Sequence, residues 1–325
     1  RFPAIRVNGE LIFLMNRQAL TQEDLEGIIQ AVLSPEHYKH FTETQELDFS
    51  YEYQGSIRLR GNVFVQQNKY SMVLRLIPHV KTLQELNLPP MLADFARRRQ
   101  GFFLVVGPVG QGKSATMSSM VGIINEERSA HVLTIEDPVE YVYEPKKAII
   151  DQREVGIDTA SFEAGLRSAF RQDVNVILIG EMRNAETMAA AVTAAETGHL
   201  VLSTLHTNNA SQTIDRIIDS FPAAQQDQVR IQLASSLIGI FSQRLVPRVA
   251  GGRIPVYELL INNAAVANLI REKRTHEIDM VIETGFEQGM IDMNRCLVDL
   301  VRQGEITIET AYAYSLNPKN LERLL

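Results

Sequence analysis

The sequence is short of cysteine, of long apolar runs and of net positive charge, and each shortage excludes a class of protein. Cys296 is the one cysteine in 325 residues, so an internal disulfide framework and a four-cysteine zinc site are both excluded. No apolar run approaches the roughly 18 residues that a membrane-spanning helix needs, so no integral membrane segment is expected. The net charge of −7 argues against a nucleic-acid-binding protein.

The rest of the composition is typical of a globular protein. Hydrophobic residues make up 45% and charged residues 22% of the chain, and the length indicates about two domains. Cys296 lies in an apolar stretch, which favours a buried core thiol. No signal peptide is visible, so a cytoplasmic location is expected. Because Arg1 is not an initiator methionine, we expect that the chain starts inside a longer product.

Residues 1–77 predict a small α+β domain. Asn8-Gly9 lies between two apolar segments and is a strong signal for a β-hairpin. Thr21 and Ser34-Pro35 are typical of helix starts. Alternating apolar and polar residues from Leu47 onward predict strands that complete an antiparallel sheet.

Three arginines stand out in this predicted sheet. Arg58 and Arg60 lie two residues apart, hence on one face of a strand, and Arg75 lies in the next predicted strand. They either form a solvated basic face or present cations to the nucleotide of a neighbouring subunit. The residues alone leave both interpretations open.

Residues 78–88 are predicted to be a linker, followed by a helix that runs to Arg99 within a second domain, 89–325. From residue 102 to residue 219 strands and helices alternate, which is typical of a mostly parallel sheet with helices on both faces. Ligands of such α/β sheets bind at the carboxyl ends of the strands. Beyond the alternating part, the pattern predicts a helix over 223–245, a strand over 253–261 and a small helical bundle from about 262.

A glycine-rich turn follows the first buried strand of this domain. Residues 107–114 read GPVGQGKS and fit the phosphate-loop pattern G-x-x-x-x-G-K-[ST]. Glycines let backbone N–H groups approach an anion, and the next helix adds its positive end. Lys113 supplies a cation and Ser114 a hydroxyl for Mg²⁺. We therefore expect a nucleoside triphosphate bound by Gly107, Pro108, Val109, Gly110, Gln111, Gly112, Lys113, Ser114 and Ala115.

Carboxylates follow two further strands at their carboxyl ends. Glu136, Asp137 and Glu140 lie in one such loop, where a general base for the attacking water or support for a metal ligand is the natural role. Glu181 ends an apolar strand at the position that holds Mg²⁺ in phosphate-loop enzymes, directly or through water.

Two histidines bracket the strand after Glu181. His206 follows its carboxyl end and is expected to contact or sense the γ-phosphate. His199 lies at the other end and is expected to be structural. Seven residues apart across a strand, the two cannot chelate one metal ion from adjacent turns.

The order of these elements resembles a known family, the ATPases of bacterial type II secretion and type IV pilus systems. Within that family the chain is similar to the ATPases that retract type IV pili. The similarity covers essentially the whole chain. It is carried by the segments 107–116, 134–142, 151–159, 166–173, 176–187, 193–210, 213–222 and 267–278.

The resemblance implies a fold and a set of roles. The fold would be a PAS-like N-terminal domain joined to a RecA-like domain, assembled as a homo-hexameric ring that binds ATP and Mg²⁺. Lys113 and Ser114 match the Walker A positions, Glu140 matches the catalytic glutamate and Glu181 the Walker B glutamate. His199 and His206 match the family's histidine box. Arg58, Arg60 and Arg75 match a segment whose arginines reach a nucleotide in trans.

The resemblance also implies a partner and a place in the cell. ATP hydrolysis would change the angle between the domains, and a platform protein in the inner membrane would receive that motion. The chain would then be cytoplasmic and peripheral to the inner membrane, with no nucleic-acid partner. Its single cysteine favours the retraction branch, because extension ATPases usually carry a four-cysteine zinc motif.

Departures from the family pattern leave alternatives open. Ala115 replaces a common threonine, Val109 and Gln111 replace a common threonine and serine, and 265–272 lacks the first arginine of the family's AIRNLIRE motif. The family's segment before the first hairpin is absent. An accessory paralogue of the retraction ATPase and a secretion-system ATPase therefore remain alternatives, with a RecA-like nucleic-acid translocase further off.

Overall fold

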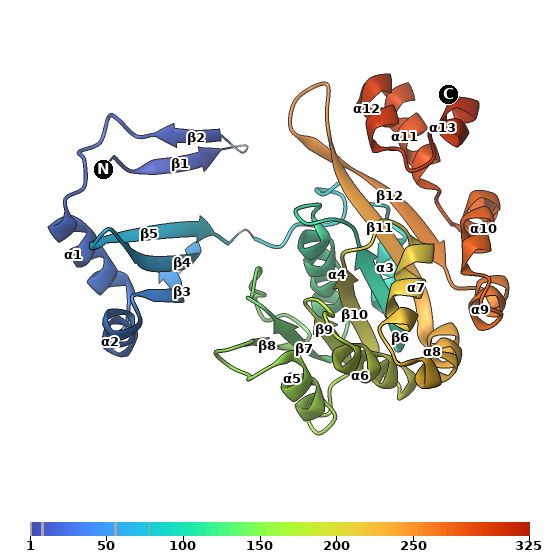
Figure 1. The fold of residues 1–325 in the computed structure, drawn as a ribbon, viewed down its shortest axis with the longest axis horizontal. Helices are drawn as coiled ribbons and strands as arrows, with labels where there is room; N and C mark the ends of the chain where they lie inside the picture. Colours follow the sequence, from blue (N-terminus) through green and yellow to red (C-terminus); the bar gives the residue numbers. More distant parts are fainter. Residues whose placement is uncertain (1, 8–9, 55–56, 78) are drawn as a thin grey trace. The chain divides into compact units, whose positions relative to one another are not determined.

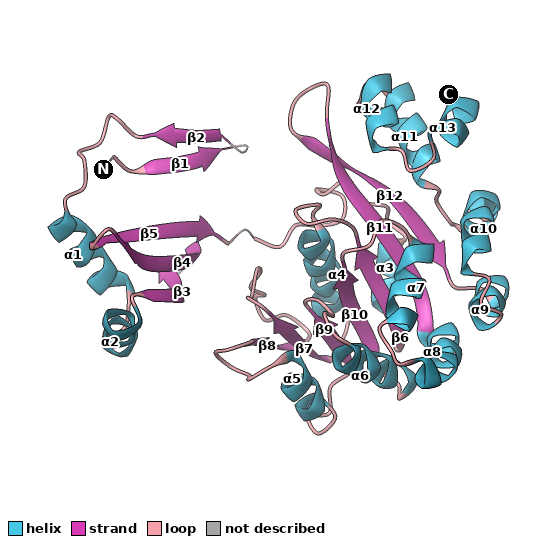
Figure 2. Ribbon diagram, viewed as in Figure 1, coloured by secondary structure: helices cyan, strands magenta, loops and turns pink. Residues whose placement is uncertain are grey.

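The computed structural model describes residues 2–7, 10–54, 57–77 and 79–325 (Figure 1). The chain divides into two compact units, Arg1–His79 and Val80–Leu325. The predicted α/β fold is confirmed, since the second unit contains a large, mostly parallel sheet with helices (Figure 2). Among the helices of the described ranges, none has the length and apolar character needed to cross a membrane.

The first unit contains a hairpin, two helices and a three-stranded antiparallel sheet. The predicted hairpin is confirmed by the antiparallel pairing of β1 and β2, and its turn, Asn8-Gly9, lies outside the described residues. Thr21 and Ser34 cap the two helices by accepting hydrogen bonds from Asp24 N–H and His37 N–H. The elements are β1 (Ala4–Val7), β2 (Glu10–Phe13), α1 (Gln22–Val32), α2 (Pro35–Thr44), β3 (Glu46–Tyr53), β4 (Ile57–Gln66) and β5 (Lys69–Leu76).

The two helices cover one face of this small sheet. Ile29 from α1 and Phe41 from α2 are fully buried against Phe49 and Val63 of the strands. Gly61 of β4 lies opposite Phe49 of β3, and an added Cβ at this glycine would fall 2.2 Å from the Phe49 ring. The glycine therefore makes room for an aromatic side chain of the neighbouring strand.

The connection between the units is shorter than predicted. Residues 80–88 were expected to form most of a linker, but Leu83 and Leu88 are only 8% and 6% exposed. They pack with Leu92 and Phe95 of α3 (Leu92–Arg97) in the core of the second unit. The helix predicted to run to Arg99 is confirmed only over the six residues of α3.

A seven-stranded sheet forms the centre of the second unit, in the order β12-β11-β6-β10-β9-β7-β8. All neighbouring strands are parallel except β12, which pairs antiparallel with β11. The predicted alternation of strands and helices between residues 102 and 219 is confirmed except after β7, where a second strand, β8, comes before the next helix. The strands are β6 (Gly101–Val106), β7 (His131–Glu136), β8 (Ile149–Glu154), β9 (Val176–Ile179), β10 (Leu200–Leu205), β11 (Leu237–Pro247) and β12 (Arg253–Ile261).

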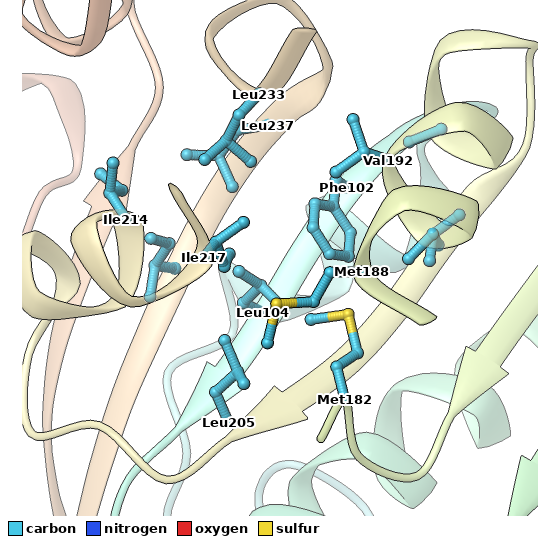
Figure 3. Packing of buried hydrophobic residues seen from close by; sticks show 14 of the residues in the cluster. Phe102, Leu104, Met182, Met188, Val192, Leu205, Ile214, Ile217, Leu233 and Leu237 are labelled. Atoms are coloured by element: carbon cyan, nitrogen blue, oxygen red, sulfur yellow. The ribbon is translucent and has the colours of Figure 1, made fainter. Parts of the chain in front are cut away.

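Helices cover both faces of this sheet, and alternate residues of the interior strand β6 face opposite layers. Phe102 and Leu104 of β6 pack with α6, α7 and α8, as Figure 3 shows. Phe103 and Val105 pack with α3 and α4 on the other face. The helices are α4 (Lys113–Glu127), α5 (Phe162–Ala169), α6 (Ala185–Glu196), α7 (Ala210–Asp219) and α8 (Ala223–Ser236).

One predicted element is wrong in its second half. Residues 223–245 were expected to be helical throughout, but the helix ends at Ser236 and residues 237–247 form β11. No glycine or proline separates α8 from the apolar run that begins at Leu237, and a short apolar run alone does not distinguish a strand from a helix. Residues 237–247 form a strand because they pair with β6 on one side and with β12 on the other.

The sequence also gave no sign of strand β8. Its residues, IIDQRE, alternate poorly between apolar and polar, and β8 pairs with one neighbour only, β7. An edge strand needs less apolar character than a central one, which is why its pattern is weak.

The predicted C-terminal helical bundle is present. Its last three helices pack around the far ends of β11 and β12 through Val246, Ile254 and Leu297. Cys296 is buried in this cluster, as expected, and burial raises the pKa of its thiol to about 12. The elements are α9 (Ala264–Arg271), η1 (Thr275–Glu277), α10 (Ile278–Thr284), η2 (Phe286–Gln288), α11 (Met293–Arg302), α12 (Ile308–Tyr314) and α13 (Pro318–Leu324).

Candidate active site

The glycine-rich loop connects β6 to α4 at the carboxyl edge of the sheet. Gly107, Gly110 and Gly112 have φ angles of +146°, +76° and +83°, which other residues rarely adopt. At Gly107 space is also lacking, because an added Cβ would fall 2.3 Å from the backbone oxygen of Gln243. Both constraints require glycine at this position.

Gly107 N–H donates to the backbone oxygen of Leu205 at 3.3 Å, but the later N–H groups of the loop have no partner within the described part of the chain. Among the described residues, none accepts a hydrogen bond from the N–H groups of residues 109–115. These groups include the first turn of α4, a helix of 15 residues whose N-terminal end is positive. Unpaired donors at a helix N-terminus are what a phosphate group needs, so the loop fits the predicted nucleotide.

Lys113 is buried at the centre of the site. Its Nζ atom donates to the backbone oxygens of Gly107 and Pro108, at 2.7 and 2.9 Å, and lies 3.2 Å from His206 Nδ1. Burial lowers the pKa of this amine to about 8, although the nearby charges of Glu181 and Glu140 act in the opposite direction. The Lys113 side chain thus folds back and contacts the backbone of the glycine-rich loop.

His206 links Lys113 to Glu181. A lysine ammonium can only donate, so Nδ1 of the imidazole must be the acceptor, and Nε2 carries the hydrogen. Nε2 donates to Glu181 Oε2 at 3.0 Å. The residues that the sequence predicted at the ends of β6, β9 and β10 therefore form one connected chain of polar contacts.

Arg183 is a member of the site that the sequence analysis missed. It forms ion pairs with Glu181 and, at 3.3 Å, with Asp137. The arginine thereby bridges the acidic loops that follow β9 and β7. Because Arg183 comes only two residues after Glu181, its position in the sequence could have indicated that it lies in the site.

The end of β7 and the loop after it carry a half-buried carboxylate, Glu136, and an exposed one, Glu140. Burial raises the pKa of Glu136, although hydrogen bonds from Thr134 Oγ1 (2.7 Å), Glu140 N–H (3.4 Å) and Gln152 Nε2 (3.4 Å) partly offset the effect. Glu140 is exposed and lies close enough to Lys113 to stabilise its charge. Glu140 therefore has the access that a base toward water needs, while Glu136 supports the loop behind it.

The predicted magnesium ligands fit that ion without forming a protein cage. Among the described residues, no group of three or more His, Cys, Asp or Glu side chains could hold a metal ion. Mg²⁺ in nucleotide sites is held mainly by phosphates and water, with only one or two protein ligands. Ser114, in the first turn of α4, and Glu181, beside Lys113, are a donor set of that size.

The predicted arginines lie in the first unit. Arg60 of β4 and Arg75 of β5 are directly opposite each other across the strand pair, and Arg58 lies two residues before Arg60 in the same strand. Like charges directly opposite each other destabilise a sheet. A bound anion would offset the repulsion between these two arginines.

His199 has the structural surroundings that were expected. Its Nδ1 atom lies 3.0 Å from the backbone oxygen of Ala194, and its ring meets Phe170 edge to face with centroids 5.8 Å apart. It lies at the amino end of β10, the end opposite to His206.

Comparison with known proteins shows that the whole chain has relatives. Residues 45–312 match the family model described as type II/IV secretion system protein. The type IV pilus retraction ATPase PilT of Pseudomonas aeruginosa is 41% identical over 319 residues, which cover 98% of this chain and 92% of the relative. The type IV pilus ATPase PilU of the same organism is 40% identical over 325 residues, which cover 99% and 85%.

A solved structure resembles this chain in both fold and sequence. The crystal structure of the pilus retraction motor PilT with bound ADP superposes with a TM-score of 0.92 at 46% identity. The superposition covers 99% of this chain and 92% of the other.

Proposed function

Because this chain belongs to the type II/IV secretion system protein family, we propose that it is an ATPase motor that retracts type IV pili. The observation that carries the proposal is the convergence of Lys113, Glu181 and His206, with Glu140 close by, at the carboxyl edge of the sheet. Similarity to a pilus retraction ATPase along nearly the full length supports it.

Each residue of the site has a proposed role. The loop N–H groups and Lys113 hold the β- and γ-phosphates, and Lys113 turns from the loop oxygens toward them. Ser114 and Glu181 hold Mg²⁺, which neutralises charge on the phosphate oxygens when it is bound. Glu140 takes the proton of the attacking water. His206, held between Lys113 and Glu181, senses the occupancy of the γ-phosphate site.

The arginines and the assembly belong to the same proposal. The chain forms a homo-hexamer in which Arg58, Arg60 and Arg75 of one subunit approach the nucleotide of the next. Hydrolysis changes the angle between the two units, and a platform protein of the inner membrane receives the motion. The motor therefore acts in the cytoplasm at the membrane surface. The similarity to a pilus retraction motor over nearly the whole chain supports the motor role.

Lys113→Ala tests the nucleotide site. The variant should show no ATP turnover above background, because a buried cation for the phosphates is gone, and undiminished turnover would refute the proposed site. A strain that lacks the gene should carry excess unretracted pili and lose twitching motility.

An accessory retraction ATPase is the second candidate function. The altered segment 265–272 favours it, and the chain is about as similar to the type IV pilus ATPase PilU as to the retraction ATPase PilT. Co-expression decides between the two. A motor restores retraction to a strain that lacks its own retraction ATPases, whereas an accessory subunit does so only beside an active motor.

A further inference from the structure

Strand β11 extends past the end of β6 and brings Gln243 to the phosphate loop. Val106, the last residue of β6, pairs with Ser242, so Gln243 lies level with Gly107. The Gln243 side chain is only 3% exposed. A second glycine of the loop, Gly112, also packs on it, since an added Cβ would fall 2.9 Å from Gln243 Nε2.

Gln243 is bonded to the loop and to the helix that follows it. Its Nε2 atom donates to the backbone oxygen of Gln111 at 2.9 Å, and its Oε1 atom accepts from Thr116 Oγ1 at 2.5 Å. Both polar ends of the buried amide are thereby satisfied within the phosphate-loop segment. A buried amide whose nitrogen and oxygen both have hydrogen-bond partners fixes the geometry of those partners.

Gln111 completes the contact from the side of the loop. Its Oε1 atom accepts a hydrogen bond from Leu245 N–H of β11 at 2.6 Å. The side chain of Gln111 thus points to β11, and both its side-chain oxygen and its backbone oxygen accept hydrogen bonds from that strand. We refer to these contacts of Gln111 and Gln243 as the glutamine clamp.

The strand that carries the clamp is firmly held. It pairs with β6 on one side and β12 on the other. Its far end enters the C-terminal core through Val246, and Arg244 donates to the backbone oxygen of Tyr314 in α12 at 3.2 Å. The loop is therefore attached to a strand that the C-terminal helices also hold.

We propose that Gln243 and Gln111 are positioning residues that hold the phosphate loop in its nucleotide-receiving conformation before ATP binds. The proposal rests on the proposed ATP site at Lys113. A loop that is already ordered loses less conformational freedom on binding. Removal of the clamp should therefore weaken ATP binding and leave the chemical step unchanged, because the polar ends of the two side chains bond to protein partners.

The test uses near-isosteric substitutions that remove only the hydrogen bonds. Gln243→Met and Gln111→Met should each raise the KM and Kd for ATP about 3- to 10-fold, the range expected for one or two neutral hydrogen bonds. The kcat values should stay within about twofold of the wild-type value. The double variant should lose less than the product of the single effects, because both side chains fix the same loop.

Gln232→Met is the matched control. This glutamine also donates a side-chain hydrogen bond, to Glu196 at 2.7 Å, but it is half-buried on α8 and does not contact the phosphate loop. Its KM and Kd should match those of the wild-type protein.

Two outcomes would overturn the proposal. Melting temperatures that fall in the clamp variants while KM and Kd stay unchanged would make the contacts merely structural. A lower kcat with unchanged KM would place the glutamines in the chemical step. Lys113→Ala separates these failures from failure of the site itself, because only an incorrect nucleotide site leaves ATP affinity intact in that variant.

Discussion

Glu258 is a fully buried carboxyl group, and replacing it by glutamine should stabilise the protein at neutral and alkaline pH. It lies on β12, and its Oε1 atom accepts hydrogen bonds from Ala210 N–H at 2.9 Å and Ser242 Oγ at 3.1 Å. Burial raises the pKa of this carboxyl from 4.5 to about 7, and the nearby acids Asp279 and Asp292 add to the rise. The two hydrogen bonds only partly offset it.

The sign and size of the effect follow from this shift. The folded protein holds the proton of Glu258 up to a higher pH than the unfolded chain does. Its stabilising contribution is therefore complete below pH 4.5 and is lost as the pH rises through 7. The shift corresponds to about 3 kcal/mol at about 1.4 kcal/mol per unit. Glutamine retains an oxygen for both hydrogen bonds and cannot lose a proton, so Glu258→Gln should escape this loss.

Urea unfolding of both proteins across a pH series measures the difference. The variant should exceed the wild-type protein in unfolding free energy by about 3 kcal/mol above pH 7, with the gap closing toward pH 4.5. Glu322→Gln, on the exposed side of α13, is the matched control and should follow the wild-type profile. A gap between Glu258→Gln and wild type that does not change with pH would refute the reasoning.

Two further predictions concern the phosphate loop. Lys113, with a pKa of about 8, should take up roughly half a proton at pH 8 when bound phosphates stabilise its charged form; calorimetry in buffers of different ionisation enthalpy measures this, and proton release would contradict it. Gly107→Ala should destabilise the protein far more than Gly110→Ala, which costs about 1–2 kcal/mol for its positive φ alone. The reason is that a Cβ meets Gln243 at position 107 and nothing within 4 Å at position 110; equal losses in thermal melting would disprove the close contact.

The parts of the site that the sequence predicts are those whose geometry is set locally. The loop between β6 and α4 is shaped by its own glycines, and the helix predicted to follow it is present and begins at Lys113. Glu181 and His206 follow from a general rule, since the carboxyl ends of parallel strands meet at one edge. The rule applies to any parallel sheet, so these residues can be placed at the site without knowing which strands are neighbours.

The missed parts depend on contacts between distant residues. Gln243 meets Gln111 across 132 positions of the chain, and no local pattern in either segment encodes the meeting. The prediction of a helix up to residue 245 concealed it further, because only in a strand do Ser242 and Gln243 point to opposite faces. Strand pairing is decided by tertiary contacts, which local propensity does not contain.

The central claim is that Glu140 is the base that acts on a phosphate held by Lys113. Glu140→Gln, which keeps the shape of the side chain and removes its basicity, tests this claim most directly when ATP affinity and turnover are measured on the same protein. The account predicts ATP binding close to that of the wild-type protein and turnover lowered by about 10²- to 10⁴-fold. Unchanged turnover, or a loss of binding equal to the loss of turnover, would contradict it.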